Sequence, residues 1–266
     1  MLIAGIDIGS GSTKCILVDE SGAVKGRGLV KTKANFEKVA GEVLDMARSD
    51  AGPAAGQVGY VATTGLGRYA VPFRDIQITD LTCGARGAAT LFPSTKYVLD
   101  IGAQCSRAIK LRENGKVKEF HMNEKCAAGS GGFLERAAKY LEVRIADVGP
   151  MSLQAAKPQP ISSVCAVLAE TEIINHISDG ASVENILRGI HDSLADRSLL
   201  LLKRVGLDGE VTLIGGVALQ EGMLASLRDK LGVTVNVPKE PHLTAALGAA
   251  LLGLQRYRKL ATAAAA

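Results

Sequence analysis

The chain has 266 residues, and because 47% of them are hydrophobic it can bury a substantial core, which argues against disorder. It carries 31 basic and 27 acidic residues, and the resulting charge of +4 is too small to favour nucleic-acid binding. Aromatic residues make up only 4% and tryptophan is absent, which argues against a surface on which bases stack.

The N-terminal stretch MLIAGIDIGS lacks the basic region and the long apolar region of a signal peptide. The run LTAALGAALLGL near the C-terminus is too short to span a bilayer. We therefore predict a soluble cytoplasmic protein without a membrane partner. Its cysteines are then expected to be reduced thiols or metal ligands rather than disulfides. These cysteines are Cys15, Cys83, Cys105, Cys126 and Cys165.

An internal repeat with an offset of 93 residues organises the chain. GIDIGSGSTKCILVDESGAVKGRGLV, which starts at residue 5, matches VLDIGAQCSRAIKLRENGKVKEFHMN, which starts at residue 98. Each copy predicts a strand, a glycine-containing turn, a second strand, a turn at 21–22 or 114–115, and a third strand. Two such copies imply two related lobes. The aligned pairs are Asp7 with Asp100, Gly9 with Gly102, Lys14 with Arg107, Ile16 with Ile109, Gly22 with Gly115 and Val24 with Val117.

Helix-like and strand-like segments alternate in the rest of the chain, which predicts an α/β architecture. QVGYVATTG and EVTLIGG indicate strands that end in glycine. We expect one lobe at 1–95, a second lobe at 96–260, a helix at 243–260 that packs back on the first lobe, and a frayed tail at 261–266. Helical spacing is found at 36–49, 131–141, 166–178 and 183–205, and in GMLASLRDKLG and LTAALGAALLGLQRYRK.

The glycine turn in GIDIGSGSTK is a candidate phosphate site, although the chain has no GxxxxGK[ST] motif. Backbone N–H groups in such a turn can bind phosphate oxygens, and a carboxylate at a strand end can hold hydrated Mg²⁺. An ordinary hairpin turn is the alternative for one copy, but the duplicate favours a clamp on one polyphosphate. The predicted catalytic carboxylates are Asp7 and Asp100. Gln104 would orient the attacking water or contact the γ-phosphate, or serve as a plain turn residue.

The residues predicted to bind the nucleotide come from both copies and from a third glycine turn that ends a strand and opens a helix. They are Gly9, Ser10, Gly11, Ser12, Thr13, Lys14, Gly102, Gly215 and Gly216. The paired DIG turns, the IGG turn and TAALGAALLG resemble the actin-like, Hsp70 and sugar kinase (ASKHA) superfamily. The resemblance implies two ribonuclease H-like lobes with ATP and Mg²⁺ bound between them.

Two cysteines precede helical segments: Cys126 precedes AAGSGGFLERAAKYL and Cys165 precedes AVLAETEIINHIS. Unpaired N–H groups at a helix N-terminus stabilise an anion such as a thiolate or the sulfurs of an iron–sulfur cluster. The glycines would let the backbone approach the cluster or the nucleotide closely. The alternative is that both cysteines are small buried hydrophobic residues. Because a cubane cluster normally takes four thiolates, we predict one [4Fe–4S] cluster shared by two subunits.

NEKCAAGSGGFLE and ISSVCAVLAETEIIN resemble the two cluster motifs of the BadF/BadG/BcrA/BcrD-type ATPase family. That family includes the activators of 2-hydroxyacyl-CoA dehydratases and the ATPase subunits of benzoyl-CoA reductase. The resemblance implies an ATP-hydrolysing electron-transfer subunit, with ferredoxin as electron donor and catalytic acyl-CoA reductase subunits as acceptor.

VLDIGAQCSRAIKL, SSVCAVLAETEIIN and NILRGIHDSLADR look most like the small reductase subunits, which share the cluster with a related larger ATPase subunit. Cys105 stands where the activators usually carry an acidic residue. The alternatives are a homodimeric dehydratase activator, a small-molecule kinase of the same fold with Asp80 as base, and a structural actin-like protein. Glu170 would reach the nucleotide or favour the helix dipole.

Overall fold

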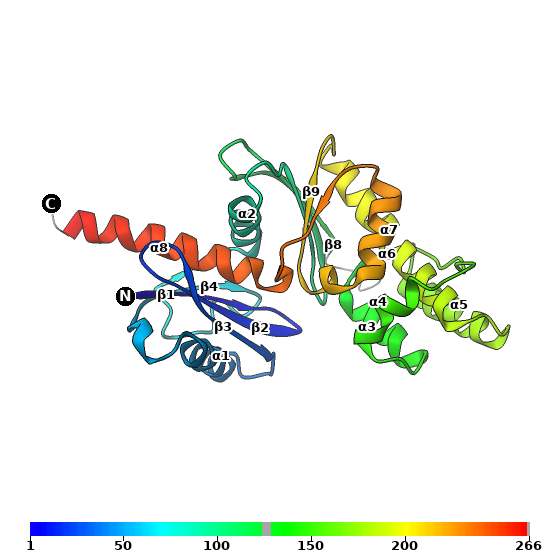
Figure 1. The fold of residues 1–266 in the computed structure, drawn as a ribbon, viewed down its shortest axis with the longest axis horizontal. Coiled ribbons are helices and arrows are strands. Elements are labelled where there is room, and N and C mark those ends of the chain that lie inside the picture. The colour runs from blue at the N-terminus through cyan, green and yellow to red at the C-terminus, as the bar shows by residue number, and fades with distance from the viewer. Residues whose placement is uncertain (124–128, 265–266) are drawn as a thin grey trace. The chain divides into compact units, whose positions relative to one another are not determined.

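The computed structural model describes residues 1–123 and 129–264 (Figure 1). The chain forms two compact units. Unit 1 comprises Met1–Ser94, Glu113–Val117 and Leu243–Ala266, and unit 2 comprises Thr95–Arg112 and Lys118–His242.

Unit 1 is built on a five-stranded sheet in the order β3-β2-β1-β4-β5. β1 (Leu2–Ile8) pairs antiparallel with β2 (Ser12–Val18), which pairs antiparallel with β3 (Val24–Lys31). On its other edge β1 pairs parallel with β4 (Val58–Gly65), and β4 pairs parallel with β5 (Ile76–Gln77). Every residue of β1 is buried, as expected for a strand whose two faces are both covered by helices.

Helices cover both faces of this sheet. α1 (Phe36–Ala51) packs on the face that carries Ile6 and Ile8, and α8 (Thr244–Ala264) packs with α2 (Asp80–Leu91) on the face that carries Ile3 (Figure 1). α8 lies very close to β1, since a Cβ added to Gly5 of β1 would lie 2.2 Å from the carbonyl oxygen of Ala246 in α8. The small residues of α8 permit this close contact. α8 continues past residue 260 to Ala264, so residues 261–264 are helical rather than a frayed tail. The short η1 (Pro53–Ala55) follows α1.

Unit 2 repeats the sheet of unit 1, with the order β10-β9-β6-β7-β8. As the internal repeat predicts, β6 and β7 form a hairpin and β8 lies next to β7. β9 pairs parallel with β6 in the place that β4 takes beside β1. The strands are β6 (Tyr97–Ile101), β7 (Ser106–Leu111), β8 (Val117–Asn123), β9 (Val211–Ile214) and β10 (Val235–Asn236).

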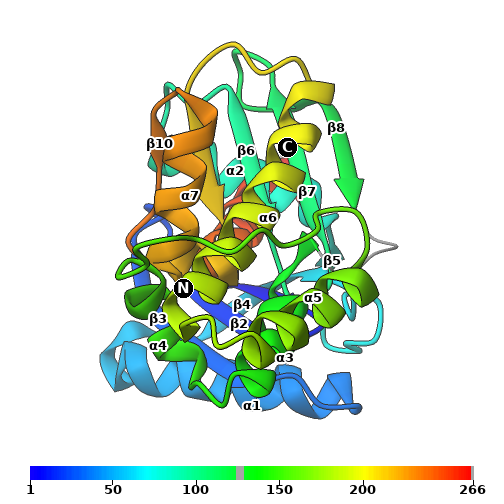
Figure 2. The same ribbon diagram turned by 90° about the vertical axis from the view of Figure 1, so that its right-hand side faces the viewer.

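Between its third and fourth strands the described part of unit 2 has four helices, where unit 1 has α1 and the short η1. α6 and α7 pack against each other, and α3 contacts both α4 and α5 (Figure 2). The core centres on β6, whose Leu99 and Ile101 pack with Leu194 of α6 and Leu227 of α7. The helices and turns are α3 (Gly131–Tyr140), α4 (Ile145–Ser152), α5 (Ala166–Ser178), α6 (Val183–Arg204), η3 (Gly216–Leu219), α7 (Glu221–Leu231) and η4 (Pro241–Leu243).

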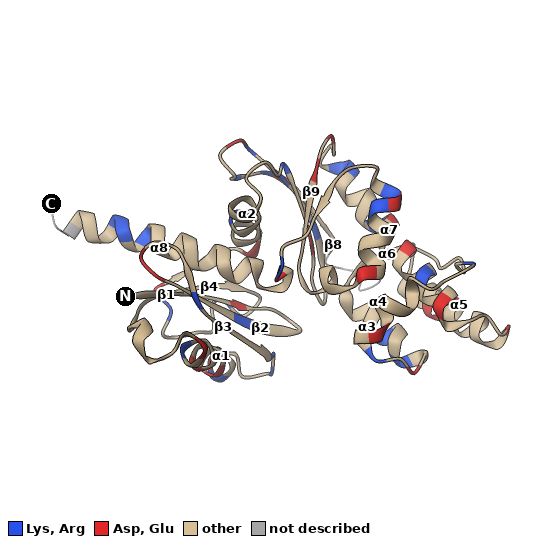
Figure 3. Ribbon diagram, viewed as in Figure 1, with Lys and Arg blue, Asp and Glu red and all other residues tan. Residues whose placement is uncertain are grey.

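None of the helices in the described part of the chain combines the length and the apolar character that crossing a membrane requires. In the view of Figure 3, acidic and basic residues occur together on α1, α6 and α7 rather than as a face of one sign.

Candidate functional site

The carboxylate of Asp7 lies near the end of β1, beside a cation and a glycine. The antiparallel register places Lys14 opposite Asp7, and the Lys14 Nζ lies 3.2 Å from the Asp7 Oδ2. Gly65 ends β4 with φ of +84°, and a Cβ there would lie only 2.5 Å from both the Asp7 Oδ1 and the Ile8 carbonyl oxygen. Only glycine fits this approach without moving the carboxylate, and its positive φ also favours glycine.

Unit 2 repeats this arrangement with different residues. Arg107 lies opposite Asp100, and its Nη1 is 2.9 Å from the Asp100 Oδ2. Gly215 follows β9 with φ of +90°, and a Cβ there would lie 2.7 Å from the Asp100 Oδ1 and 2.4 Å from the Ile101 carbonyl oxygen. Each unit therefore holds one carboxylate between a cation and a glycine at the end of the neighbouring parallel strand.

Each carboxylate is followed by a tight turn, which we call the first turn (residues 9–12) and the second turn (residues 102–105). The Gly9 N–H donates to the Ser12 carbonyl at 3.2 Å, and the Gly102 N–H donates to the Cys105 carbonyl at 2.9 Å. Ser10 and Gly11 are exposed at the tip of the first turn. In the second turn Gln104 is exposed, and Cys105 is half-buried. Exposed backbone next to a carboxylate fits the binding of phosphate with hydrated Mg²⁺.

The Thr13 hydroxyl has a structural partner inside unit 1. Its Oγ1 lies 2.9 Å from the Oγ1 of Thr32, which in turn donates to the Gly9 carbonyl at 2.7 Å. Thr13 is fully buried, so this hydroxyl braces the first turn. The sequence does not single out Thr32, because its role depends on the pairing of β2 with β3. Thr63 is likewise buried, and its Oγ1 donates to the Arg68 carbonyl at 2.8 Å.

The third glycine turn begins η3. Gly215 lies against Asp100, whereas Gly216 is exposed and a Cβ added to it would meet nothing within 4 Å. The two adjacent glycines therefore differ: the first makes room for the carboxylate, and the second exposes backbone at the start of the helical turn.

The cysteines fall into two physical classes. Cys15 and Cys83 are fully buried, and burial raises the pKa of each thiol to about 12, which keeps both protonated at neutral pH. Cys165 is the N-cap residue of α5, is half-buried, and makes no side-chain capping hydrogen bond. Cys126 lies outside the described residues.

The sequence predicts Cys165 as a cluster ligand, and the structure places this residue at the N-terminus of α5. Among the described residues, no group of three or more His, Cys, Asp and Glu side chains could hold a metal ion.

The glycines at the start of α3 contact the second turn. The Gly131 N–H donates to the Gly102 carbonyl at 2.9 Å, and the Gly132 N–H donates to the Ala103 carbonyl at 2.7 Å. A Cβ added to Gly132 would lie 2.8 Å from the Ala103 carbonyl oxygen. The sequence suggested that these glycines allow a close approach to the cluster or the nucleotide. In the structure they make room for the second turn, and their two N–H groups are already hydrogen-bonded.

Two further acidic residues have local partners. The Glu170 Oε1 accepts a hydrogen bond from the Arg136 Nε at 2.8 Å, so Glu170 joins α5 to α3. Asp80, the base of the kinase alternative, lies in the first turn of α2, and its Oδ1 accepts from the Leu81 N–H at 3.1 Å.

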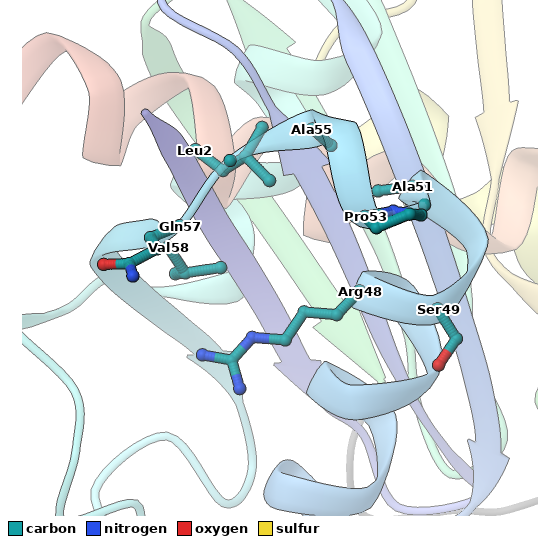
Figure 4. A pocket seen from close by; sticks show the side chains of 10 residues that line it. Leu2, Arg48, Ser49, Ala51, Pro53, Ala55, Gln57 and Val58 are labelled. Carbon is teal, nitrogen blue, oxygen red and sulfur yellow. The ribbon is translucent and has the colours of Figure 1, made fainter.

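A pocket of about 610 Å³ lies in unit 1 beside Leu2, at the end of β1 that is remote from Asp7 (Figure 4). Its polar side chains are those of Arg48, Ser49 and Gln57. Arg48 also pairs with Asp45 at 3.2 Å. Because Leu2 and Asp7 are five residues apart on one strand, roughly 16 Å separates this pocket from the predicted phosphate turn.

Known proteins of one family resemble this chain in both sequence and structure. The sequence model of the BadF/BadG/BcrA/BcrD ATPase family matches residues 4–253. The chain is 43% identical to a subunit of the benzoyl-CoA reductase of Thauera aromatica, over 98% of this chain and 95% of that protein.

Two solved structures match nearly the whole chain. The activator of the 2-hydroxyisocaproyl-CoA dehydratase from Clostridium difficile, with bound ADPNP, has a TM-score of 0.93 at 35% identity and covers 98% of this chain and 97% of its own. Component A of the Acidaminococcus fermentans (R)-2-hydroxyglutaryl-CoA dehydratase has a TM-score of 0.92 at 33% identity, covering 97% and 99%. With the duplicated sheet, these matches confirm the predicted α/β, actin-like fold class.

Proposed function

The chain belongs to the BadF/BadG/BcrA/BcrD ATPase family, and we propose that it hydrolyses MgATP to drive low-potential electrons into a partner acyl-CoA reductase of the benzoyl-CoA reductase type. The observation that carries the ATPase part is the duplicated carboxylate, cation and glycine: Asp7 with Lys14 and Gly65, and Asp100 with Arg107 and Gly215. The ADPNP bound to a structure with a TM-score of 0.93 supports a nucleotide in this fold.

Each turn is assigned phosphate contacts in this proposal. Asp7 and Asp100 orient the waters of a hydrated Mg²⁺, and the exposed N–H groups of the first turn bind phosphate oxygens. Lys14 and Arg107 keep positive charge beside the carboxylates, which limits repulsion between them and the phosphates. Gln104, which is exposed on the second turn, orients the attacking water.

The electron-transfer part assigns Cys126 and Cys165 to a [4Fe–4S] cluster, which supplies one-electron chemistry at low potential when bound. A second ATPase subunit contributes the other two thiolates. Large apolar side chains around Cys165 are exposed: Val164 by 80%, Val167 by 68% and Leu168 by 54%. Such exposure supports a contact surface for a partner subunit at this position. Ferredoxin is the proposed electron donor, and the catalytic reductase subunits are the acceptor.

A homodimeric dehydratase activator is the second candidate, because the two solved structures described above are a dehydratase activator and a dehydratase component. The reductase subunit is favoured by the higher identity of 43%, against 37% for a curated activator. Anaerobic purification of the native complex separates the candidates: a larger related ATPase subunit supports the reductase, and two identical copies support the activator. A purified protein without iron and sulfide would contradict both.

The ATPase proposal is tested with Asp7→Asn and Asp100→Asn, which keep the size of the side chain and remove its charge. Each should lower kcat/KM for MgATP by at least about 100-fold, the scale expected when a group that stabilises charge in the transition state is lost. Asp45→Asn is the control, because Asp45 is exposed on α1 and forms a surface ion pair with Arg48. ATPase activity near the wild-type value in both site variants would refute the proposal.

A further inference from the structure

The second turn is hydrogen-bonded directly to the chain that begins α3. Two of these bonds run from Gly131 and Gly132 to the carbonyls of Gly102 and Ala103. A third runs from the Ser106 Oγ to the Gly129 carbonyl. Ser106 is 2% exposed, so this bond is shielded from water. The second turn and Ser106, the residue that follows it, are therefore joined to residues 129–132 by three hydrogen bonds.

The packing around these bonds is as close as glycine allows. A Cβ added to Gly131 would lie 3.0 Å from the Val217 side chain, and one added to Gly129 would lie 2.7 Å from the Asn123 Nδ2. Residues 129–132 therefore have little free space on the side that faces these neighbours, although the second turn itself is partly exposed. A shift of the carbonyls of the second turn must therefore move the start of α3 or break the hydrogen bonds.

The same position of the internal repeat has a different partner in unit 1. Thr13 aligns with Ser106 at the offset of 93 residues. The Thr13 hydroxyl bonds to Thr32 at the end of its own hairpin, and Thr32 bonds back to the first turn. The first turn is thus braced by its own hairpin, whereas the second turn is braced by the helix segment that follows it.

A further contact extends the connection to α5. The Arg136 side chain of α3 donates to Glu170 of α5 at 2.8 Å, and the Tyr140 hydroxyl donates to the other oxygen of Glu170 at 3.4 Å. Cys165 is the N-cap of α5. A continuous series of contacts therefore runs from the second turn through α3 to the helix that begins at Cys165.

We propose that the second turn passes a shift caused by the bound nucleotide to the start of α3, and that Ser106 is the positioning residue for this coupling. Arg136 and Glu170 extend the coupling from α3 to α5. The proposal rests on the proposed function in placing the nucleotide phosphates at the second turn and the cluster at Cys126 and Cys165. The first turn, which is braced by Thr32 of its own hairpin, is not assigned this role. Because coupling is reciprocal, a change at the cysteines alters nucleotide affinity through the same contacts.

The test compares amide hydrogen exchange at residues 129–133 with ADP and with a non-hydrolysable ATP analogue, on the anaerobically purified complex. We expect the wild-type protein to exchange at different rates with the two nucleotides. In Ser106→Ala the exchange rate without nucleotide should rise roughly 2- to 12-fold, the factor that corresponds to one net hydrogen bond, and the difference between the nucleotides should shrink. Ser106→Thr, which restores a hydroxyl, should recover the wild-type difference.

Ser198→Ala is the matched control, because it removes a buried serine hydroxyl of the same unit that bonds to the Leu194 carbonyl within α6. It should keep the wild-type difference between the nucleotides. If Ser106→Ala does not fold, Arg136→Gln tests the next contact: it should reduce the nucleotide dependence at the start of α5 and leave residues 129–133 unchanged.

Nucleotide binding to the same samples is measured by calorimetry. The inference is overturned if the wild-type protein binds nucleotide but residues 129–133 exchange at the same rate with ADP and with the ATP analogue. It is also overturned if Ser106→Ala keeps the full wild-type difference in exchange rate. Both outcomes leave the ATPase proposal intact. A wild-type complex that binds no nucleotide overturns both.

Discussion

The glycines that end β4 and follow β9 offer a direct test of the duplicated site, through Gly65→Ala and Gly215→Ala. An alanine at Gly215 would bring its Cβ to 2.4 Å from the Ile101 carbonyl oxygen, whereas Cβ atoms in proteins stay beyond 3.0 Å from such atoms. The end of β6 must therefore move by at least half an ångström, and Asp100 moves with it. The backbone conformation of Gly215, with φ of 90° and ψ of 175°, is almost exclusive to glycine and adds about 1–3 kcal/mol of strain for alanine.

A displacement of about 1 Å at a reacting centre can lower a rate about 100-fold, which corresponds to about 2.7 kcal/mol in the activation free energy. We therefore expect each variant to lose about 100-fold in kcat/KM for MgATP, measured anaerobically with a coupled assay for ADP. The loss should be similar for both variants, because the two glycines contact equivalent atoms.

The controls are Gly209→Ala in unit 2 and Gly41→Ala in unit 1, where an added Cβ meets nothing within 4 Å and φ is not positive. Both should keep wild-type activity, and Gly41→Ala should slightly stabilise α1, since alanine is the better helix former. A folded Gly65→Ala or Gly215→Ala protein with ATPase activity within twofold of wild type would show that the carboxylate and glycine contact does not position the catalytic group.

Three further predictions concern the histidine, the cysteines and the contact between α3 and α5. Burial lowers the pKa of His191 to about 4, so between pH 6.5 and pH 4 this residue is protonated in the unfolded chain but not in the folded one. The free energy of unfolding should therefore fall by about 2 kcal/mol from pH 7 to pH 5. His191→Gln should flatten this pH dependence in thermal unfolding, and an unchanged slope would contradict the prediction. Cys165→Ser should remove most iron and sulfide from the anaerobic complex. Cys15→Ser changes a buried thiol and should keep both. A full iron content in Cys165→Ser would disprove the ligand assignment. Glu170→Gln should cost about 1 kcal/mol or less in stability, because Arg136 is partly exposed, and a larger loss in urea unfolding would mean that the contact is stronger than its exposure implies.

The His191 prediction rests on its surroundings. Its Nδ1 lies 2.8 Å from the Ser152 Oγ, and its Nε2 is buried without a hydrogen-bond partner among the described residues. Asp192 favours the protonated form and Arg188 disfavours it, but the removal of water dominates the pKa, so the neutral form is the native one. The four histidines show no metal-ligand spacing, so the sequence predicts structural or surface roles for them, and the structure shows that His191 is buried.

The sequence by itself determined the features that local patterns encode. Alternation and turn residues predicted the duplicated hairpins, and the strand ends placed Asp7 and Asp100 before their turns. Helical spacing located α6 to within one residue at its end. Cys165 was predicted to begin a helix and is the N-cap of α5. In each case the residues that decide the structure are close neighbours in the chain.

Only the tertiary structure decided which distant segments touch. The sequence shows glycines at 65, 215, 131 and 132, but not that the first two face a carboxylate and the last two face the second turn. The bond of Thr32 with Thr13 and the bond of Ser106 with Gly129 were equally hidden. These contacts depend on how parallel strands and helices pack after the chain has folded. Local patterns cannot encode them, because a glycine needed for a turn and one needed for a close approach are the same letter in the sequence.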